Sequence, residues 1–246
     1  MLLHVSDRLD LPLVTNQKFS DYTWTLGSLA FSPEGDRIAF QRFGDQTGYR
    51  IWISDTEGAG PAVQLDPVSI GTMHQDAPTW SPTDGGNWVV YVQGIPGGTW
   101  QLVKKRVRDR DRTVLSEKVL PLSRTAWSPD GKWILFNSVD GLAIVSPDGG
   151  EPRDLGADEW FAYGWSDDSK AILGLRESDD GGHYMLVRLD VATGRERVVA
   201  ADLGTIPPAT QPIRGLSSMG NGEFITSVAR PSSGIFVLDG VKTLRR

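Results

Sequence analysis

The sequence repeats itself, and this self-similarity restricts the possible fold more than any other feature. Five segments align: LAFSPEGDRIAF from Leu29, PTWSPTDGGNWVVY from Pro78, TAWSPDGKWILF from Thr125, YGWSDDSKAILG from Tyr163 and RGLSSMGNGEFITS from Arg214. Each carries one large apolar anchor residue before a polar turn, namely Phe31, Trp80, Trp127, Trp165 and Leu216. The anchors are 49, 47, 38 and 51 residues apart. A period of about 40 to 50 residues is typical of repeats that each form one four-stranded sheet.

Each repeat predicts a series of short strands. The anchor ends the first strand, and a Ser-Pro-Asp-Gly-like turn follows, in which Pro restricts φ and Gly accepts a positive φ. An apolar run such as WVVY or WILF then predicts a second strand that is buried on both faces. Third strands are predicted at 49–54, 100–104, 142–146, 184–190 and 235–238, and fourth strands at 62–65, 113–116 and 197–200. Almost no helix is expected, because no segment has a sustained 3.6-residue apolar period.

The turn after a Trp or Phe, the apolar strand and the IWISD-like third strand resemble the TolB-type, WD-repeat-like β-propeller family over residues 24 to 240. We therefore expect an all-β propeller of five to six four-stranded blades, formed by a single domain over residues 1–246. Residues 1–20 would supply N-terminal strands that make a closing or partial blade and so remove exposed sheet edges. The alternative is a chain cut from a longer propeller. The resemblance also implies a periplasmic or cell-envelope setting and a protein partner, although the N-terminus shows no signal peptide.

Composition argues against several classes of partner. The chain has 31 acidic and 25 basic residues, evenly spread, for a formal charge of −6, so nucleic acid is not the expected partner. The longest apolar runs are four to six residues, which predicts no membrane span. The chain has no cysteine, which excludes a cysteine nucleophile and a thiolate metal site.

Position within the repeat distinguishes tryptophans that are expected to be structural from those that are not. Of nine tryptophans, seven fall in anchor or strand positions and are predicted to be core: Trp52, Trp80, Trp88, Trp100, Trp127, Trp133 and Trp165. Trp24 and Trp160 lie just before an anchor, where the chain would enter the innermost strand and line the mouth of the central channel. These pre-anchor segments supply the predicted mouth residues Asp21, Trp24, His74, Asp76, Arg124, Glu159, Trp160, Tyr163 and Arg214. Because Trp, Tyr and Arg dominate binding hot spots, the mouth is a candidate partner-binding surface. The alternative is that these residues pack on a neighbouring blade.

A second candidate surface is a cluster of cations, which we call the basic rim hairpin. It contains Lys104, Lys105, Arg106, Arg108, Arg110 and Arg112, interrupted by Asp109 and Asp111. The cluster is typical of a solvated hairpin whose charge discourages edge-to-edge pairing of sheets. The alternative is a docking site for an acidic partner or for anionic lipid headgroups.

Catalytic chemistry has little support in the sequence. The three histidines, His4, His74 and His183, lie in different contexts, and a metal site like that of some lyases with this propeller type would need all of them to converge. Nucleophile-elbow, HExxH and phosphate-loop motifs are missing from the sequence. The Asp pairs at 167–168 and 179–180 lack the spacing of a calcium loop and fit hairpin turns instead.

We therefore predict a non-catalytic propeller that acts as a protein-interaction scaffold or as a subunit of a larger complex. It would have no catalytic residues, metal or cofactor. The alternative is a propeller enzyme, a lyase or hydrolase, with a ligand or metal in the funnel near His74, Asp76 and Arg124.

Overall fold

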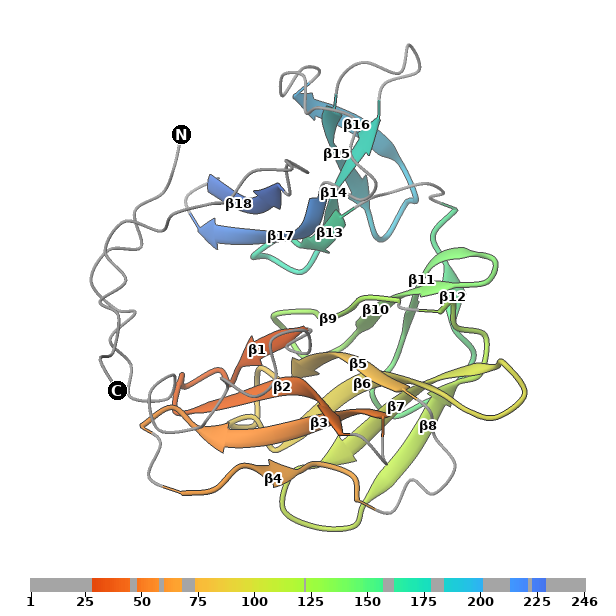
Figure 1. Cartoon of the computed structure of the whole chain (residues 1–246). Coiled ribbons are helices and arrows are strands. Elements are labelled where there is room, and N and C mark those ends of the chain that lie inside the picture. The colour runs from red at the N-terminus through yellow and green to blue at the C-terminus, as the bar shows by residue number, and fades with distance from the viewer. Residues whose placement is uncertain are drawn as a thin grey trace, which may run out of the picture.

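The computed structural model describes residues 28–44, 48–57, 60–67, 74–121, 123–156, 162–177, 184–200, 213–220 and 223–228, and the regular structure in these ranges is all β-strand, without a helix (Figure 1). In chain order the strands are β1 (Leu29–Phe31), β2 (Arg37–Gly44), β3 (Gly48–Asp55), β4 (Val63–Gln64), β5 (His74–Trp80), β6 (Trp88–Gly94), β7 (Trp100–Arg106), β8 (Arg112–Ser116), β9 (Thr125–Trp127), β10 (Ile134–Ser138), β11 (Gly141–Val145), β12 (Arg153–Asp154), β13 (Ala162–Trp165), β14 (Ala171–Glu177), β15 (Tyr184–Asp190), β16 (Glu196–Ala200), β17 (Ile213–Gly220) and β18 (Glu223–Val228).

Each of the first four sequence repeats forms one antiparallel meander of four strands. We call β1–β4, β5–β8, β9–β12 and β13–β16 blades 1 to 4, and the pair β17–β18 follows them. The first strand of each blade lies at its inner edge, where β1, β5, β9 and β13 succeed one another in contact (Figure 1). Blades 1 and 2 are joined into one eight-stranded sheet by a parallel bridge between Tyr49 and His74.

The predicted third and fourth strands agree with the structure to within two residues at their ends, where they are described. The fifth repeat differs, because its first strand was predicted to end at the anchor Leu216 but β17 continues to Gly220, in a segment that lacks the Pro and Asp of the other turns. Third strands appear as β3, β7, β11 and β15, and the predicted fourth strands appear as β4, β8 and β16. The sequence missed β12, because Arg153–Asp154 is only two residues long and has low β-propensity. The strand predicted at 235–238 and the closing strands predicted in 1–20 lie outside the described residues. Blade number and ring closure therefore stay predictions.

The core lies in the seams between successive blades rather than in one central cluster. Fully buried aliphatic and aromatic side chains from the facing sides of two blades make each seam, which accounts for second strands that are apolar on both faces. Burying one such large side chain contributes about 1.5 to 3 kcal/mol. The fully buried members include Ala39, Ile51, Val89 and Tyr91 between blades 1 and 2, Val92, Leu102, Ile134 and Phe136 between blades 2 and 3, and Leu135, Ile144, Ile172 and Val187 between blades 3 and 4.

Two anchor tryptophans join their blade to the preceding one. The Trp80 and Trp165 rings are 5% and 6% exposed. Their indole N–H groups donate to the carbonyls of Ala30 (2.9 Å) and Ala126 (3.0 Å), each the residue before the preceding blade's anchor. The anchor of blade 1 differs, because Phe31 has no N–H to donate and is 53% exposed.

Of the seven tryptophans predicted to be core, Trp80 and Trp165 are buried, and four others, namely Trp52, Trp100, Trp127 and Trp133, pack against the core from partly buried positions. Trp52, Trp88, Trp100, Trp127 and Trp133 are only partly buried. The rings of three of them are partly covered by long cationic side chains, whose charged ends stay near water. Arg42 lies 5.1 Å from the Trp52 ring centroid, Lys104 and Arg106 lie 4.6 and 4.5 Å from that of Trp88, and Arg153 lies 5.7 Å from that of Trp133.

The serine after each anchor explains why the turn sequence recurs. Ser32 Oγ donates to Asp36 Oδ1 (2.7 Å) and accepts from the Arg37 backbone N–H (3.0 Å). The same pair of bonds is made by Ser128 with Asp130 and Trp133, and by Ser166 with Asp168 and Ala171. Hydrogen bonds from Ser32 and Ser166 also hold the pKa of Asp36 and of Asp168 below the ordinary value. The turn is therefore a closed hydrogen-bonded unit encoded within six residues.

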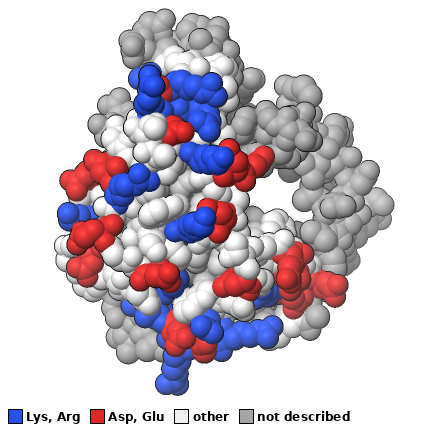
Figure 2. All heavy atoms as spheres, turned by 180° about the vertical axis from the view of Figure 1, so that it is seen from behind, with Lys and Arg blue, Asp and Glu red and all other residues white. Residues whose placement is uncertain are grey.

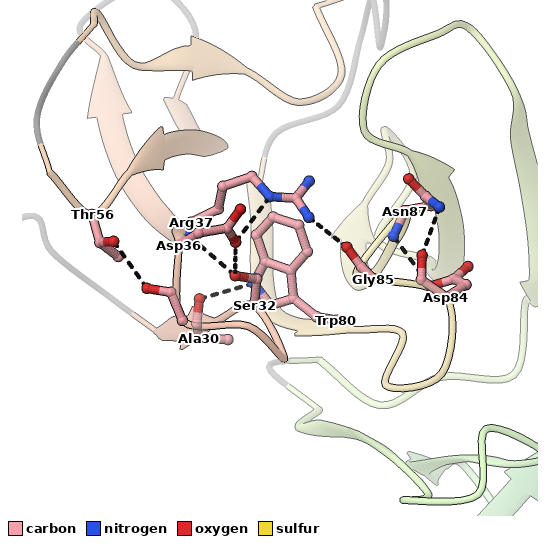
Figure 3. Close-up of polar contacts among 10 residues, drawn as sticks. Ala30, Ser32, Asp36, Arg37, Thr56, Trp80, Asp84, Gly85 and Asn87 are labelled. Atoms are coloured by element: carbon pink, nitrogen blue, oxygen red, sulfur yellow. Dashed lines mark hydrogen bonds and ion pairs between the residues drawn. The ribbon is translucent and has the colours of Figure 1, made fainter.

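Neighbouring turns also contact one another across the first seam (Figure 3). Arg37 extends from blade 1 over the Trp80 ring, 4.9 Å from its centroid, and Nη2 donates to the Gly85 carbonyl (2.6 Å). Gly86 has a positive φ of 65°, and a Cβ there would lie 3.0 Å from Pro33 and 3.1 Å from Trp80. Only glycine fits this close approach of the two turns.

Candidate functional site at the channel mouth

Strand register places the two predicted surfaces at opposite ends of blade 2. At one end, His74 of β5 aligns with Gly94 of β6 and Trp100 of β7. At the other end, Val89 of β6 aligns with Lys105, the second cation of the basic rim hairpin. The predicted mouth and the basic rim hairpin can therefore act independently.

Four aromatic side chains form a row across the end of blades 1 and 2 that carries His74, and we call them the aromatic row. Ring centroids are 5.1 Å apart from Phe43 to Tyr49, 4.6 Å from Tyr49 to His74 and 5.4 Å from His74 to Trp100. Gly94 makes room for the last ring, since a Cβ there would lie 3.2 Å from the Trp100 indole. All four side chains are half-buried. The row thus joins the β2–β3 hairpin of blade 1 to the β6–β7 hairpin of blade 2 through His74.

His74 sits between an amide and a carboxylate. Its Nε2 lies 3.0 Å from Gln41 Nε2 of blade 1 and 3.6 Å from Asp76 Oδ2 of its own strand. The His74 side chain is 23% exposed and that of Asp76 is 18% exposed. The site is therefore sheltered but remains open to a ligand or to solvent.

Asp76 is the centre of a hydrogen-bonded clamp that links three blades. Its Oδ1 accepts from Ser28 Oγ and from the Ala77 backbone N–H (2.7 Å), and the Ala77 carbonyl accepts from Thr125 Oγ1 of blade 3 (2.6 Å). Burial raises the pKa of Asp76, but the nearby His74 ring and the hydrogen bonds from Ser28 and the Ala77 N–H outweigh it, so that the pKa of Asp76 lies below the ordinary value. Asp76 is therefore an ionised acceptor at neutral pH.

The structure describes only some of the predicted mouth residues. Arg124 is half-buried directly before β9, and the backbones of Tyr163 and Arg214 lie in β13 and β17. Asp21, Trp24, Glu159 and Trp160 lie outside the described residues. The prediction that the described members line one surface stays untested.

Sequence reasoning missed several residues that surround His74, namely Ser28, Gln41, Phe43, Tyr49 and Trp100. Most of them lie on second and third strands, which were assigned to the core by their position in the repeat. A signal existed in the strand register, because the start of each third strand lies at the same end of the blade as the pre-anchor segment.

Most cations of the basic rim hairpin already have partners within the protein. Lys105 is 4% exposed, and its Nζ donates to the carbonyls of Arg106 (2.9 Å) and Asp109. Arg106 Nε lies 3.3 Å from a carboxylate oxygen of Asp109 and 3.3 Å from one of Asp111.

Two further cations bind neighbouring segments. Lys104 Nζ donates to the Pro147 carbonyl of blade 3, and Arg112 Nε pairs with Asp66 Oδ2 at 3.0 Å. Arg108 and Arg110 are exposed. These contacts fit the structural interpretation of the hairpin, and only its tip offers exposed arginine side chains.

Charges of both signs are interspersed over the face shown in Figure 2. Lys and Arg gather at the end that carries β13–β16, at the top of both overall views. On these strands Arg176 pairs with Glu196 (3.5 Å), and Arg188 pairs with Asp190 (3.9 Å). The described basic groups are thus largely matched by carboxylates.

The geometry around Asp76 does not resemble a nucleophilic site. Ser28 Oγ donates to Asp76 rather than to His74, so the serine–histidine hydrogen bond of a Ser-His nucleophile is not formed here. Among the described residues there is no cluster of three or more His, Cys, Asp or Glu side chains suited to a metal ion. Nor does this part of the chain contain a helix with the length and apolarity needed to cross a membrane.

Repeated meanders, seams between successive blades and first strands at the inner edge define a β-propeller. No protein-family model and no curated protein matches the sequence. Among solved structures, the chain is similar to TolB from Acinetobacter baumannii (TM-score 0.58, 19% identity, over 80% of this chain and 49% of that one). It is also similar to a putative TolB from Agrobacterium tumefaciens (TM-score 0.53, 18% identity, over 69% of this chain and 63% of that one). A third similar structure is an oligogalacturonate lyase from Vibrio parahaemolyticus (TM-score 0.52, 14% identity, over 68% of this chain and 49% of that one).

The chain therefore has the TolB-type β-propeller fold, as the sequence resemblance implied. It spans about half of the Acinetobacter TolB chain and less than two thirds of the Agrobacterium chain. These likenesses concern the fold, which serves binding proteins and enzymes alike.

Proposed function

We propose that this protein is a non-catalytic binding platform that recognises a protein partner through the channel mouth. The observation that carries the proposal is the clamp of Ser28, Asp76, Ala77 and Thr125, which joins the pre-anchor segments of three successive blades. Groups that are already held relative to one another lose little conformational entropy when a partner binds. A rigid mouth with aromatic side chains is thus suited to binding without a large ordering cost.

The chemistry of the site supports binding more than catalysis. Asp76 has its Oδ1 occupied by two donors and its pKa lowered, which suits a structural acceptor rather than a general acid. Half-buried Tyr49 and Trp100 offer aromatic surface of the kind that dominates protein interfaces. A cell-envelope setting and a place in a larger complex belong to the same proposal and rest on the resemblance to TolB-type proteins.

The test is affinity capture from the native host with the purified chain, followed by measurement of the dissociation constant for any stoichiometric partner. A mouth variant, Trp24→Ala with Trp160→Ala, should weaken binding by about 30-fold if these residues are hot spots. The matched rim variant, Arg108→Ala with Arg110→Ala, should stay within about twofold, because its exposed side chains lie at the other end of the blade.

Thermal unfolding of both variants provides the control. If the mouth variant melts at a much lower temperature than the unaltered chain, Trp24 and Trp160 are core residues and are not binding hot spots of the mouth. Loss of the partner in the rim variant alone would move the interface to the basic rim hairpin. Failure to capture any stoichiometric partner, together with a small molecule or metal retained by the purified protein, would favour the propeller enzyme instead.

A further inference from the structure

One ring nitrogen of His74 faces two groups that make opposite demands on it. Gln41 Nε2 lies 3.0 Å from His74 Nε2, and the same amide nitrogen lies 2.6 Å from the Gln75 carbonyl oxygen. The contact with a carbonyl identifies this Gln41 atom as the N–H₂ donor rather than the amide oxygen. Asp76 Oδ2, an acceptor, lies 3.6 Å from the same His74 nitrogen.

A single nitrogen cannot satisfy both neighbours in one protonation state. Neutral imidazole with the proton on Nδ1 leaves Nε2 as an acceptor, which suits the Gln41 donor and places a lone pair near the Asp76 carboxylate. Imidazolium carries N–H on both nitrogens, which suits Asp76 and opposes the Gln41 N–H₂ group. We propose that His74 is a protonation-dependent switch of hydrogen-bond partner, from Gln41 of blade 1 when neutral to Asp76 of its own strand when charged.

The other groups around His74 are compatible with either state. From β3, Tyr49 stacks on the imidazole, and Arg50 donates to the Tyr49 carbonyl (3.0 Å). From β7, Trp100 presents its ring at 5.4 Å. Aromatic faces accept a cationic ring, so they favour imidazolium modestly without deciding the partner. Asp76 is the described carboxylate in contact with His74, and its position is held by Ser28 and the Ala77 N–H.

The two partners lie on different sides of a blade seam, which gives the switch a structural consequence. Gln41 is on β2 of blade 1, whereas His74 and Asp76 are both on β5 of blade 2. Protonation therefore exchanges a side-chain contact between blades for one within a blade, at the centre of the aromatic row. The backbone bridge between Tyr49 and His74 and the bond from Gln41 to the Gln75 carbonyl still join the blades. Histidine changes charge between about pH 5 and pH 8, so the mouth would differ between these two conditions.

This inference concerns the free protein and holds whatever binds at the mouth. Its test is a long-range ¹H–¹⁵N NMR spectrum of the imidazole of the full chain, recorded from pH 8 to pH 5 with His4→Gln and His183→Gln for assignment. We expect His74 to carry its proton on Nδ1 at pH 8, and the Gln41 side-chain amide signals to move with the same midpoint as the His74 ring. A neutral ring protonated on Nε2, or Gln41 amide signals that do not move through the transition, would overturn the proposal.

Substitutions at Gln41 provide a second readout. Gln41→Glu replaces the donor by an acceptor and should raise the midpoint of the His74 transition by about 1 pH unit, because a second carboxylate favours the cation. Gln64→Glu makes the same change on β4, where the Gln64 side chain donates to the Asp66 carbonyl (3.3 Å), and should leave the midpoint within about 0.3 pH unit. Equal midpoints in the folded Gln41→Glu variant and the unaltered chain would contradict the switch. If Gln41→Glu does not fold, the NMR measurement on the unaltered Gln41 remains decisive.

Discussion

At the scale of single residues, the clamp around Asp76 contains a strained backbone position. Ala77 has a φ of 52°, in the left-handed region that residues other than Gly seldom occupy, and Pro78 follows it. Strained positions of this kind persist when the surrounding contacts hold them in place. Here the Ala77 N–H donates to Asp76 Oδ1, and the Ala77 carbonyl accepts from Thr125 Oγ1. The clamp that shapes the mouth is thus formed at the expense of local backbone strain.

Ala77→Gly should therefore either leave the free energy of unfolding unchanged or raise it by up to about 1 kcal/mol, because glycine adopts a positive φ without steric cost. Urea denaturation measures the effect. Ala192→Gly is the matched control in an exposed turn and should be destabilising by a few tenths to about 1 kcal/mol. If both variants lose stability equally, Ala77 is not strained.

Asp76 should make stability depend on pH. The pKa of Asp76 in the folded protein lies below the ordinary value of about 3.9. Its contribution to the free energy of unfolding is therefore complete above about pH 3.9 and is lost as the pH falls through the pKa of the folded state. Asp76→Asn should lower the free energy of unfolding by about 2 kcal/mol at pH 7, with a deficit that shrinks below about pH 4. Denaturant midpoints measured from pH 7 to pH 3 would show this, and a deficit independent of pH would contradict it.

At the scale of elements, one buried network ties the connection after β4 to blade 2. Asp66 is 2% exposed and accepts from Tyr91 Oη (2.8 Å) and from Arg112 Nε (3.0 Å) at the start of β8. Burial is the main cause that raises the pKa of Tyr91, and the negative charge of Asp66 raises it further. The Tyr91 hydroxyl therefore stays a neutral donor. This network accounts for Arg112 as a structural member of the basic rim hairpin.

Arg112→Ala should cost about 3 kcal/mol of stability, because it removes the cation that donates to the buried Asp66 carboxylate, although Arg50 still contributes a favourable charge. Arg110→Ala, at the exposed tip of the same hairpin, should change stability by less than about 0.5 kcal/mol. Chemical denaturation distinguishes the two variants. Similar small effects for both would mean that Asp66 does not depend on Arg112, and the hairpin would then be free to serve a partner along its whole length.

At the scale of the whole molecule, stability should be concentrated in the seams. Val89, Val90, Tyr91 and Val92 of β6 are fully buried between two blades, whereas residues 196–199 of the outer strand β16 are all exposed. Backbone amides of β6 should exchange with solvent deuterium about 100-fold more slowly than those of β16, because the latter open without disrupting a seam. Mass spectrometry of peptic peptides can measure this, and protection of β16 equal to that of β6 would indicate a cover over that outer strand.

The repeat made much of the blade structure predictable, because the signals are local in the chain. In blades 1, 3 and 4 the serine after the anchor accepts from the backbone N–H five positions later, so a similar turn forms although the aspartate partner is four positions away in blade 1 and two in the others. Alternation, turn residues and period therefore predicted most strands and the all-β class. They did not predict which tryptophans are buried, since Trp88 and Trp133 depend on cations that strand pairing or blade packing brings over their rings.

The sequence by itself determined where most of the described third and fourth strands begin and end, how the recurring turns are built and that the repeats form sheets, because these depend on residues a few positions apart. Tertiary structure alone decided which residues surround His74 and Asp76. The Ser28–Asp76 bond joins residues 48 apart, and Gln41 reaches His74 across 33 residues. Such contacts follow from the angle and register at which one blade packs on the next, and many side chains in the seam set that geometry together. No short pattern encodes it, which is why His74 and Asp76 could be proposed from the sequence but their partners could not.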